Sequence, residues 1–320
     1  ATVSNEVTIG NSSITKFRVP GLNFVVKDST ATDNYVLTVD SNGECGWEAA
    51  AGGGASALND LSDAKTANSD AAIGIGSGAL AADDGGNATV AIGKDALNDQ
   101  TSGNFNCAVG VESFSKVTSG AQNTGLGVMS GCHNTGGGNV AVGYSALEGT
   151  AGSSSGGYHT CIGEKAGEDI TTASYCTLIG YRAGRDLTDG TNNTFIGANA
   201  GAATNSGTYY NTFIGYQSGI NNGNGHQNTF VGSNTGKNNA AWSNVFIGNE
   251  SGEDNTSGTY NTFVGRYAGT DCTSGAYNVA IGSESLKACT TGSDNVAIGY
   301  QAGKSGNDKA RNIAIGHGVL

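Results

Sequence analysis

A motif in which an aliphatic residue precedes a glycine recurs through most of this chain at nearly constant spacing. We call the glycine of each copy the anchor glycine. The fifteen predicted anchors are Gly74, Gly93, Gly110, Gly127, Gly143, Gly163, Gly180, Gly197, Gly215, Gly232, Gly248, Gly265, Gly282, Gly299 and Gly316. A repeat with a fixed period of about 17 residues indicates a stack of similar units, each packed only against its neighbours.

The positions around each anchor have a constant character. Thr or Val usually stands three residues before the anchor, and Asn stands four before it in most copies, as at Asn211 and Asn228. β-Branched residues favour short strands, and glycine permits the backbone of a tight corner. A unit of this length with one strand is too short to contain a helix as well. The sequence therefore predicts an all-β fold, a parallel β-solenoid or β-roll of about 15 coils.

A strand spacing of about 4.8 Å would make this solenoid roughly 70 Å long. The Asn column should then stack into a ladder of side-chain amides that bond one coil to the next. The predicted ladder residues are Asn193, Asn211, Asn228, Asn244, Asn261, Asn278, Asn295 and Asn312.

The column two residues before the anchor is apolar throughout and contains five consecutive Phe residues. Side chains alternate between the two faces of a strand. If the aliphatic and Thr positions on either side form the core, this column points outward, where water would meet a large apolar stripe. We therefore expect it to lie at a contact between copies of the chain; the alternative is that it faces into the coil. The predicted interface residues are Leu178, Phe195, Phe213, Phe230, Phe246 and Phe263.

The segments "NVAIGYQAG" (295–303) and "NVAVGYSAL" (139–147) resemble the head repeats of YadA-like trimeric adhesins. The resemblance covers about residues 70–320 and implies a left-handed β-roll in a homotrimer. The coils of this chain are a few residues longer than is typical of that family, and its Phe variant "NTFIG" also departs from the pattern.

The segment before the repeats (1–69) has a different character. The stretches "FRVPGLNFVV" and "YVLTVDSNGECGW" look like the strand pairs that precede the shafts of bacteriophage tail fibres, and "ALNDLSDA" (57–64) is similar to a segment found at fibre necks. The expected domains are an N-terminal β attachment module with a Gly-rich linker (1–55), a neck (56–69) and the solenoid (70–320). The resemblance implies that the module binds another fibre protein or virion protein.

Composition argues against several classes of function. The net charge is −12 and the 15 Lys and Arg residues are scattered, which disfavours nucleic acid as a partner. No apolar run approaches the length that spans a bilayer, so we expect no membrane insertion. The four His residues form no metal-binding motif, no CxxC occurs, and no pair of carboxylates stands out. We expect no catalytic residue, no metal and no cofactor.

Two of the cysteines share one place in the repeat. Cys272 and Cys289 both follow their anchors by seven residues. Stacked coils should bring them close together, and in a virion assembled in the cytoplasm they should remain thiols.

The favoured interpretation is a non-enzymatic structural protein, the shaft of a phage tail fibre used in host attachment and located in the virion. Loops rich in Asn, Tyr and Gly, including Tyr209, Tyr210, Trp242, Tyr260 and Tyr277, are suited to a cell-surface glycan, although packing within the loops would also explain them. The alternatives are an extracellular adhesin or self-assembling surface filament of a bacterium, and a tailspike-type glycan depolymerase. An ice-binding Thr face is disfavoured because the Thr column is expected in the core.

Overall fold

The computed structural model describes residues 35–39, 45–49, 64–66, 72–83, 88–204, 207–305 and 309–319. The chain divides into two compact units, residues 1–56 and 57–320. In the first unit, β1 (Tyr35–Val39) and β2 (Cys45–Ala49) form an antiparallel pair with Tyr35 opposite Ala49. The rest of the predicted attachment module, its linker and most of the neck lie outside the described residues.

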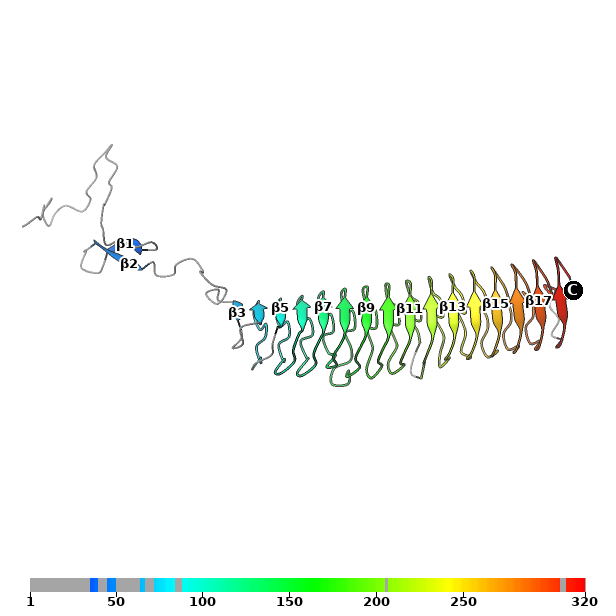
Figure 1. The fold of residues 1–320 in the computed structure, drawn as a ribbon, viewed down its shortest axis with the longest axis horizontal. Helices are drawn as coiled ribbons and strands as arrows, with labels where there is room; N and C mark the ends of the chain where they lie inside the picture. Colours follow the sequence, from blue (N-terminus) through cyan, green and yellow to red (C-terminus); the bar gives the residue numbers. More distant parts are fainter. Residues whose placement is uncertain are drawn as a thin grey trace, which may run out of the picture. The chain divides into compact units, whose positions relative to one another are not determined.

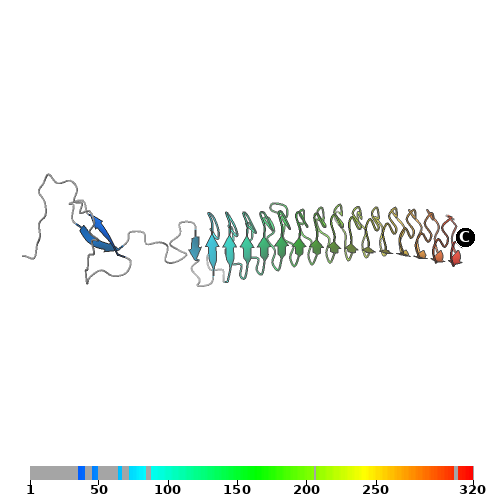
Figure 2. The same cartoon turned by 90° about the horizontal axis from the view of Figure 1, so that it is seen from above.

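The second unit is a β-solenoid with one short strand per coil (Figures 1 and 2). Fifteen strands, β4 to β18, pair in parallel and in sequence order, and β3 (Ala64–Thr66) pairs antiparallel with β4. All regular elements in the described ranges are strands. The all-β solenoid with one coil for each sequence repeat is therefore confirmed. The strands are β4 (Ile73–Ile75), β5 (Val90–Ile92), β6 (Cys107–Val109), β7 (Thr124–Leu126), β8 (Val140–Val142), β9 (Thr160–Ile162), β10 (Thr177–Ile179), β11 (Thr194–Ile196), β12 (Thr212–Ile214), β13 (Thr229–Val231), β14 (Val245–Ile247), β15 (Thr262–Val264), β16 (Val279–Ile281), β17 (Val296–Ile298) and β18 (Ile313–Ile315).

The strand register shows that the first anchor glycine was assigned to the wrong residue. Gly74 pairs with Ala91, inside strand β4, so the corner that matches Gly93 is Gly76 rather than Gly74. The sequence "IGIG" offers both glycines, and only the register decides between them. With Gly76 as the anchor, the first interval has the same length as the next one, from Gly93 to Gly110.

The middle residue of each three-residue strand points into the coil. Leu178, Phe195, Phe213, Phe230, Phe246 and Phe263 are all 0% exposed within the single chain. The expectation that these six side chains form a subunit interface is wrong, because they are the core of their own coils. Consecutive Phe rings stack with centroids 4.7–4.9 Å apart and planes 4–6° apart, which matches the strand spacing.

In most coils, one large side chain that stands at either of two positions fills the core. Phe230 in the strand faces Gly236, where an added Cβ would lie 2.5 Å from the ring. In several coils whose strand residue is Ala, as at Ala91 and Ala280, the position four after the anchor is a large buried residue, Leu97 or Leu286. Ala297 is an exception: Gly303 holds that position, and an added Cβ there would lie 2.9 Å from Leu286 of the preceding coil. Interiors are packed closely, so a coil without a large side chain of its own is filled by its neighbour's.

The asparagines of the predicted ladder are bonded from coil to coil through the backbone at every step, and at four steps also from one side-chain amide to the next. The Oδ1 atom of each accepts a hydrogen bond from the backbone N–H of the next, for example Asn228 Oδ1 from Asn244 N at 2.9 Å. Its Nδ2 donates to a loop carbonyl, as from Asn228 to Ala241 at 2.8 Å. These bonds give partners to buried backbone N–H and C=O groups that are not paired within the short strands. Bonds to Oδ1 continue without a break over Asn193, Asn211, Asn228, Asn244, Asn261, Asn278, Asn295 and Asn312.

His159 stands in the Asn column and forms the same two bonds as an asparagine. Its Nδ1 accepts from the Cys176 N–H at 3.3 Å, and its Nε2 lies 2.9 Å from the Ala173 carbonyl, to which it donates because a carbonyl can only accept. Burial lowers the pKa of His159 to about 4, although the bond to the Ala173 carbonyl opposes this shift. The ladder therefore requires the neutral ring.

This geometry predicts a pH-dependent stability. The folded pKa of His159 lies below the ordinary value near 6.5, so the unfolded chain binds the extra proton as the pH falls between these values. The histidine's contribution to stability is intact above pH 6.5, and about 3 kcal/mol should be lost as the pH falls to about 4. Urea unfolding at several pH values should show this loss for the natural chain but not for His159→Asn, which carries the residue usual in this column. Equal pH dependence in both proteins would contradict the assignment.

Candidate interaction surfaces

The buried cysteines belong to the internal packing. Cys272 and Cys289 are present as thiols, each 1% exposed, and occupy the position of Asn255 in the preceding coil. Asn255 Nδ2 donates to the Gly258 carbonyl at 2.9 Å, and the Cys272 Sγ lies 3.8 Å from the corresponding Gly275 carbonyl. The two thiols therefore continue a second polar column and line no surface.

The outer sheet face consists of the first and third residues of strands β4 to β18. The third residues are aliphatic in all fifteen strands, and Ile92, Ile214 and Ile298 are 37–38% exposed. The first residues are mostly Thr or Val. The expectation that these two columns form the core is wrong, because the middle residue fills the narrow coil and its neighbours must point the other way.

The composition of this face is unusual for a surface. None of its residues is charged, although charged residues make up 13% of the chain. The face has a regular spacing because each strand is in register with the next. A long uncharged sheet face with a continuous aliphatic column is typical of a surface that another molecule covers.

A second surface lies along the turn that precedes the strands. We call it the aromatic edge: the exposed aromatic residues five or six positions before the anchor. Tyr158 stacks on Tyr175 with centroids 5.0 Å apart, and His226 stacks on Trp242 at 5.5 Å. Trp242 continues edge-on to Tyr260, which stacks on Tyr277 at 5.0 Å. The members are Phe105, Tyr158, Tyr175, Tyr209, Tyr210, His226, Trp242, Tyr260 and Tyr277.

Several of these aromatic residues could be singled out from the sequence alone, but their alignment could not. Tyr158 and Tyr210 are 61% and 62% exposed, so packing inside the loops does not explain them. Phe105, Tyr158 and Tyr175 were missed, and the signal that would have found them is their constant distance from the anchor.

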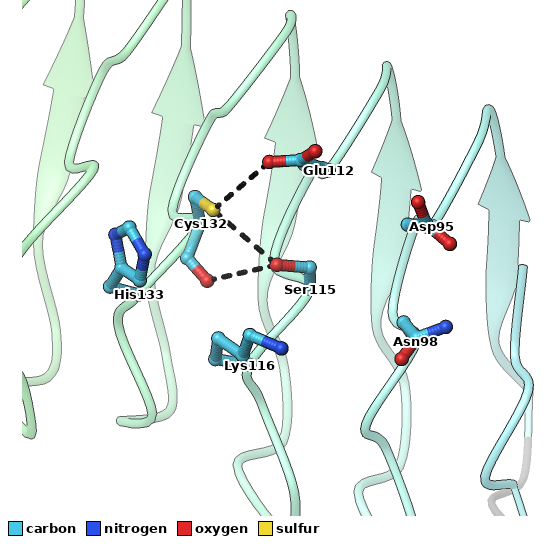
Figure 3. A pocket seen from close by; sticks show the side chains of 7 residues that line it. All are labelled: Asp95, Asn98, Glu112, Ser115, Lys116, Cys132 and His133. Atoms are coloured by element: carbon cyan, nitrogen blue, oxygen red, sulfur yellow. Dashed lines mark hydrogen bonds between the residues drawn. The ribbon is translucent and has the colours of Figure 1, made fainter. Parts of the chain in front are cut away.

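A polar pocket of about 350 Å³ crosses three coils near β5 to β7 and is lined by Asp95, Asn98, Glu112, Ser115, Lys116, Cys132 and His133. The Cys132 thiol lies 3.4 Å from Ser115 Oγ and 3.9 Å from Glu112 Oε2 (Figure 3). Lys116 pairs with Asp99 at 3.1 Å, and Lys94 pairs with Asp95 at 3.0 Å. Sequence reasoning did not find this pocket because its residues come from separate repeats.

The electrostatics of the pocket do not activate its thiol. Burial raises the pKa of Cys132, and the negative charges of Glu112 and Glu148 raise it further, against a lowering by the Ser115 hydrogen bond. A nucleophilic cysteine requires the opposite shift, toward the thiolate. His133 Nδ1 is buried without a hydrogen-bond partner in the part of the chain that the structure describes, so it does not act on the thiol as a base in this geometry.

Among the described residues, no cluster of three or more His, Cys, Asp or Glu side chains is arranged to hold a metal ion. The described ranges likewise contain no helix that is long and apolar enough to cross a bilayer. Comparison of the chain with family models, with curated proteins and with solved structures finds no match.

Proposed function

We propose that the chain is a non-enzymatic structural fibre protein, the shaft of a phage tail fibre that takes part in host attachment. The continuous 15-strand parallel sheet, held by the Asn ladder and the stacked core, supports the role of a stiff spacer. The compact unit of residues 1–56 is the part that would join another fibre or virion protein. The tail-fibre assignment rests on the resemblance of the segment before the repeats (1–69) to fibre modules.

The observation that carries this proposal is the outer sheet face. Other copies of the same chain are the partners that fit this face best. Two copies have the same strand repeat, so their uncharged faces can stay in register along the whole length of the contact. The chain carries a net charge of −12, so association must be driven by burial of apolar area rather than by charge attraction. A homotrimer, as the YadA-like resemblance implies, would turn three such faces toward one axis.

Light scattering on the dilute protein tests this assembly. The expected mass is that of three chains. Placing charges on the outer sheet face in the double variant Ile214→Lys/Ile247→Lys should yield monomers with an unchanged β-sheet circular dichroism spectrum, because an unpaired buried charge is costly at an interface. Ser257→Lys, which adds the same charge at an exposed loop position, is the control and should leave the mass unchanged. A natural chain that is monomeric at every concentration would contradict the proposal.

An extracellular adhesin or surface filament remains the second candidate, and the aromatic edge is the observation that favours it, since such an edge suits attachment to a surface. Location separates the two functions. Antibodies against the solenoid should label fibres on purified phage particles; labelling confined to the bacterial envelope would favour the adhesin.

A further inference from the structure

The solenoid does not require aromatic residues at the aromatic edge. The position five before the anchor has a left-handed backbone in coil after coil, with φ of +61° at Tyr158 and +59° at Tyr277. Gly138 and Asn192 fill the same position in other coils with φ of +74° and +58°. Gly and Asn adopt this conformation readily, whereas a bulky side chain is strained there. At Tyr158, Tyr175, Tyr210, Tyr260 and Tyr277 the chain therefore places a bulky ring where Gly or Asn would be less strained.

The display is ordered as well as exposed. From His226 to Tyr277 the rings follow one another over four consecutive coils with centroids 5.0–5.5 Å apart. Trp242 and Tyr260 are each 43% exposed and Tyr277 is 58% exposed, so the row remains open to solvent along its length. Backbone strain at exposed, ordered side chains, here Tyr260 and Tyr277, is a feature of binding sites.

The residues beside three of the four rings are uncharged hydrogen-bonding residues: Gln227, Ser243 and Thr259. Gln227 and Ser243 occupy the left-handed position in the coils of His226 and Trp242, and their side chains bond to each other at 3.4 Å. Flat aromatic rings beside amides and hydroxyls are the combination that gives recognition surfaces both rigid apolar contact and adaptable hydrogen bonding.

We propose that the aromatic edge from His226 to Tyr277 binds a neutral glycan chain laid along the solenoid axis. A sugar ring has an apolar C–H face and a rim of hydroxyls, which match the rings and the amides of the edge. A polymer with a short repeat can contact successive coils in the same way. This inference rests on the proposed attachment role and deepens it, because it gives the shaft a ligand class and a place to hold it.

Charge disfavours anionic polymers as ligands of this segment. No Lys or Arg stands at the five or six positions before the anchor in the four coils of the segment, where the residues are His226, Gln227, Trp242, Ser243, Thr259, Tyr260, Ala276 and Tyr277. The whole chain has a net charge of −12, which repels acidic polysaccharides and nucleic acids at a distance.

The edge contains its own reporter for the test. The chain has two Trp residues, Trp47 and Trp242, so Trp47→Phe leaves Trp242 as the sole source of tryptophan fluorescence. In this background we would titrate cellohexaose, chitohexaose and maltohexaose as neutral probes and oligogalacturonate as the anionic probe. Saturable change in Trp242 emission with at least one neutral probe, and none with the anionic probe, is the expected result.

Variants at the tyrosines separate binding at the edge from a general effect on the protein. Tyr260→Asn and Tyr277→Asn place at these sites the residue that Asn192 shows to fit the backbone, so folding is preserved. Each should weaken binding about tenfold, the equivalent of one lost aromatic contact. Tyr216→Asn, an exposed tyrosine just after an anchor and outside the edge, should leave the affinity unchanged.

Three results would overturn the inference: no saturable change with any neutral probe, equal loss of affinity in Tyr216→Asn and Tyr277→Asn, or tighter binding of oligogalacturonate. Because the oligomeric mass is measured in the same samples, a monomeric chain that binds glycan and a trimer that does not are distinguishable outcomes. The first outcome would support glycan binding at the aromatic edge and contradict the trimeric shaft. The second would support the trimeric shaft and contradict glycan binding.

Discussion

Replacing Gly180 with alanine should destabilise the solenoid by about 4 kcal/mol, although the change adds only one methyl group. Gly180 is an anchor glycine with φ of +133°, a region that is essentially closed to residues with a Cβ. An added Cβ would lie 2.6 Å from the carbonyl oxygen of Gly197, the next anchor along the stack. The coils would have to separate there to make room.

Separation would strain the backbone hydrogen bonds that join the coils. Gly180 N donates to the Ile162 carbonyl and Gly197 N to the Ile179 carbonyl, both at 2.8 Å. Each weakened bond contributes about 1 kcal/mol to the loss, and the forbidden φ contributes about 1–3 kcal/mol more. Chemical denaturation followed by circular dichroism would measure the total. Hydrogen exchange should show the greatest loss of protection in strands β9 to β11.

A matched control isolates the effect of close stacking. Gly152 also has a positive φ, +73°, but an added Cβ there meets no atom within 4 Å. Gly152→Ala should therefore cost only the roughly 1–2 kcal/mol of the left-handed conformation. Equal losses in the two variants would contradict the argument that anchor glycines set the distance between coils.

The repeat length and the β-branched strands were sufficient to predict the solenoid, because a unit of about 17 residues leaves few other architectures. The position of the asparagines was also predictable, since a polar residue at a constant place in a stacked fold must find its partner in the next coil. The predicted bonds from amide to amide are present at four steps of the ladder, for example from Asn278 Nδ2 to Asn261 Oδ1 at 3.1 Å. The backbone bonds that join every step were not predictable, because they depend on which N–H groups the short strand leaves without a partner, as at Asn244.

Which face of each strand points inward was not predictable from alternation alone. Alternation along a strand places the middle residue on one face and its two neighbours on the other, but it does not say which face is buried. Here the residues on both faces are largely apolar. Size would have been the better guide. Phe230 is followed six positions later by Gly236, whereas Ala91 is followed six positions later by Leu97, and only side chains that share one interior need to exchange volume in this way.

That exchange leads to the second large effect. Phe230→Ala should destabilise the chain by about 3–5 kcal/mol, because it leaves a cavity between the stacked rings of Phe213 and Phe246. Gly236→Leu alone should also be destabilising, by about 1–3 kcal/mol, since its Cβ would overlap the Phe230 ring at 2.5 Å. Combining the two changes should restore about half of the stability lost in Phe230→Ala, because Leu then fills the space that the ring vacated.

The backbone already permits this rescue. Gly236 has φ of +55°, and Leu97 and Leu286 hold the same position in their coils at φ of +47°. The double variant therefore reproduces in one coil the Ala and Leu pairing that coils at both ends of the solenoid use. A double-mutant cycle from urea unfolding should give a favourable coupling of several kcal/mol between the two sites. Additive losses would mean that the two positions do not share one cavity, and the account of how this sequence fills its core would then be wrong.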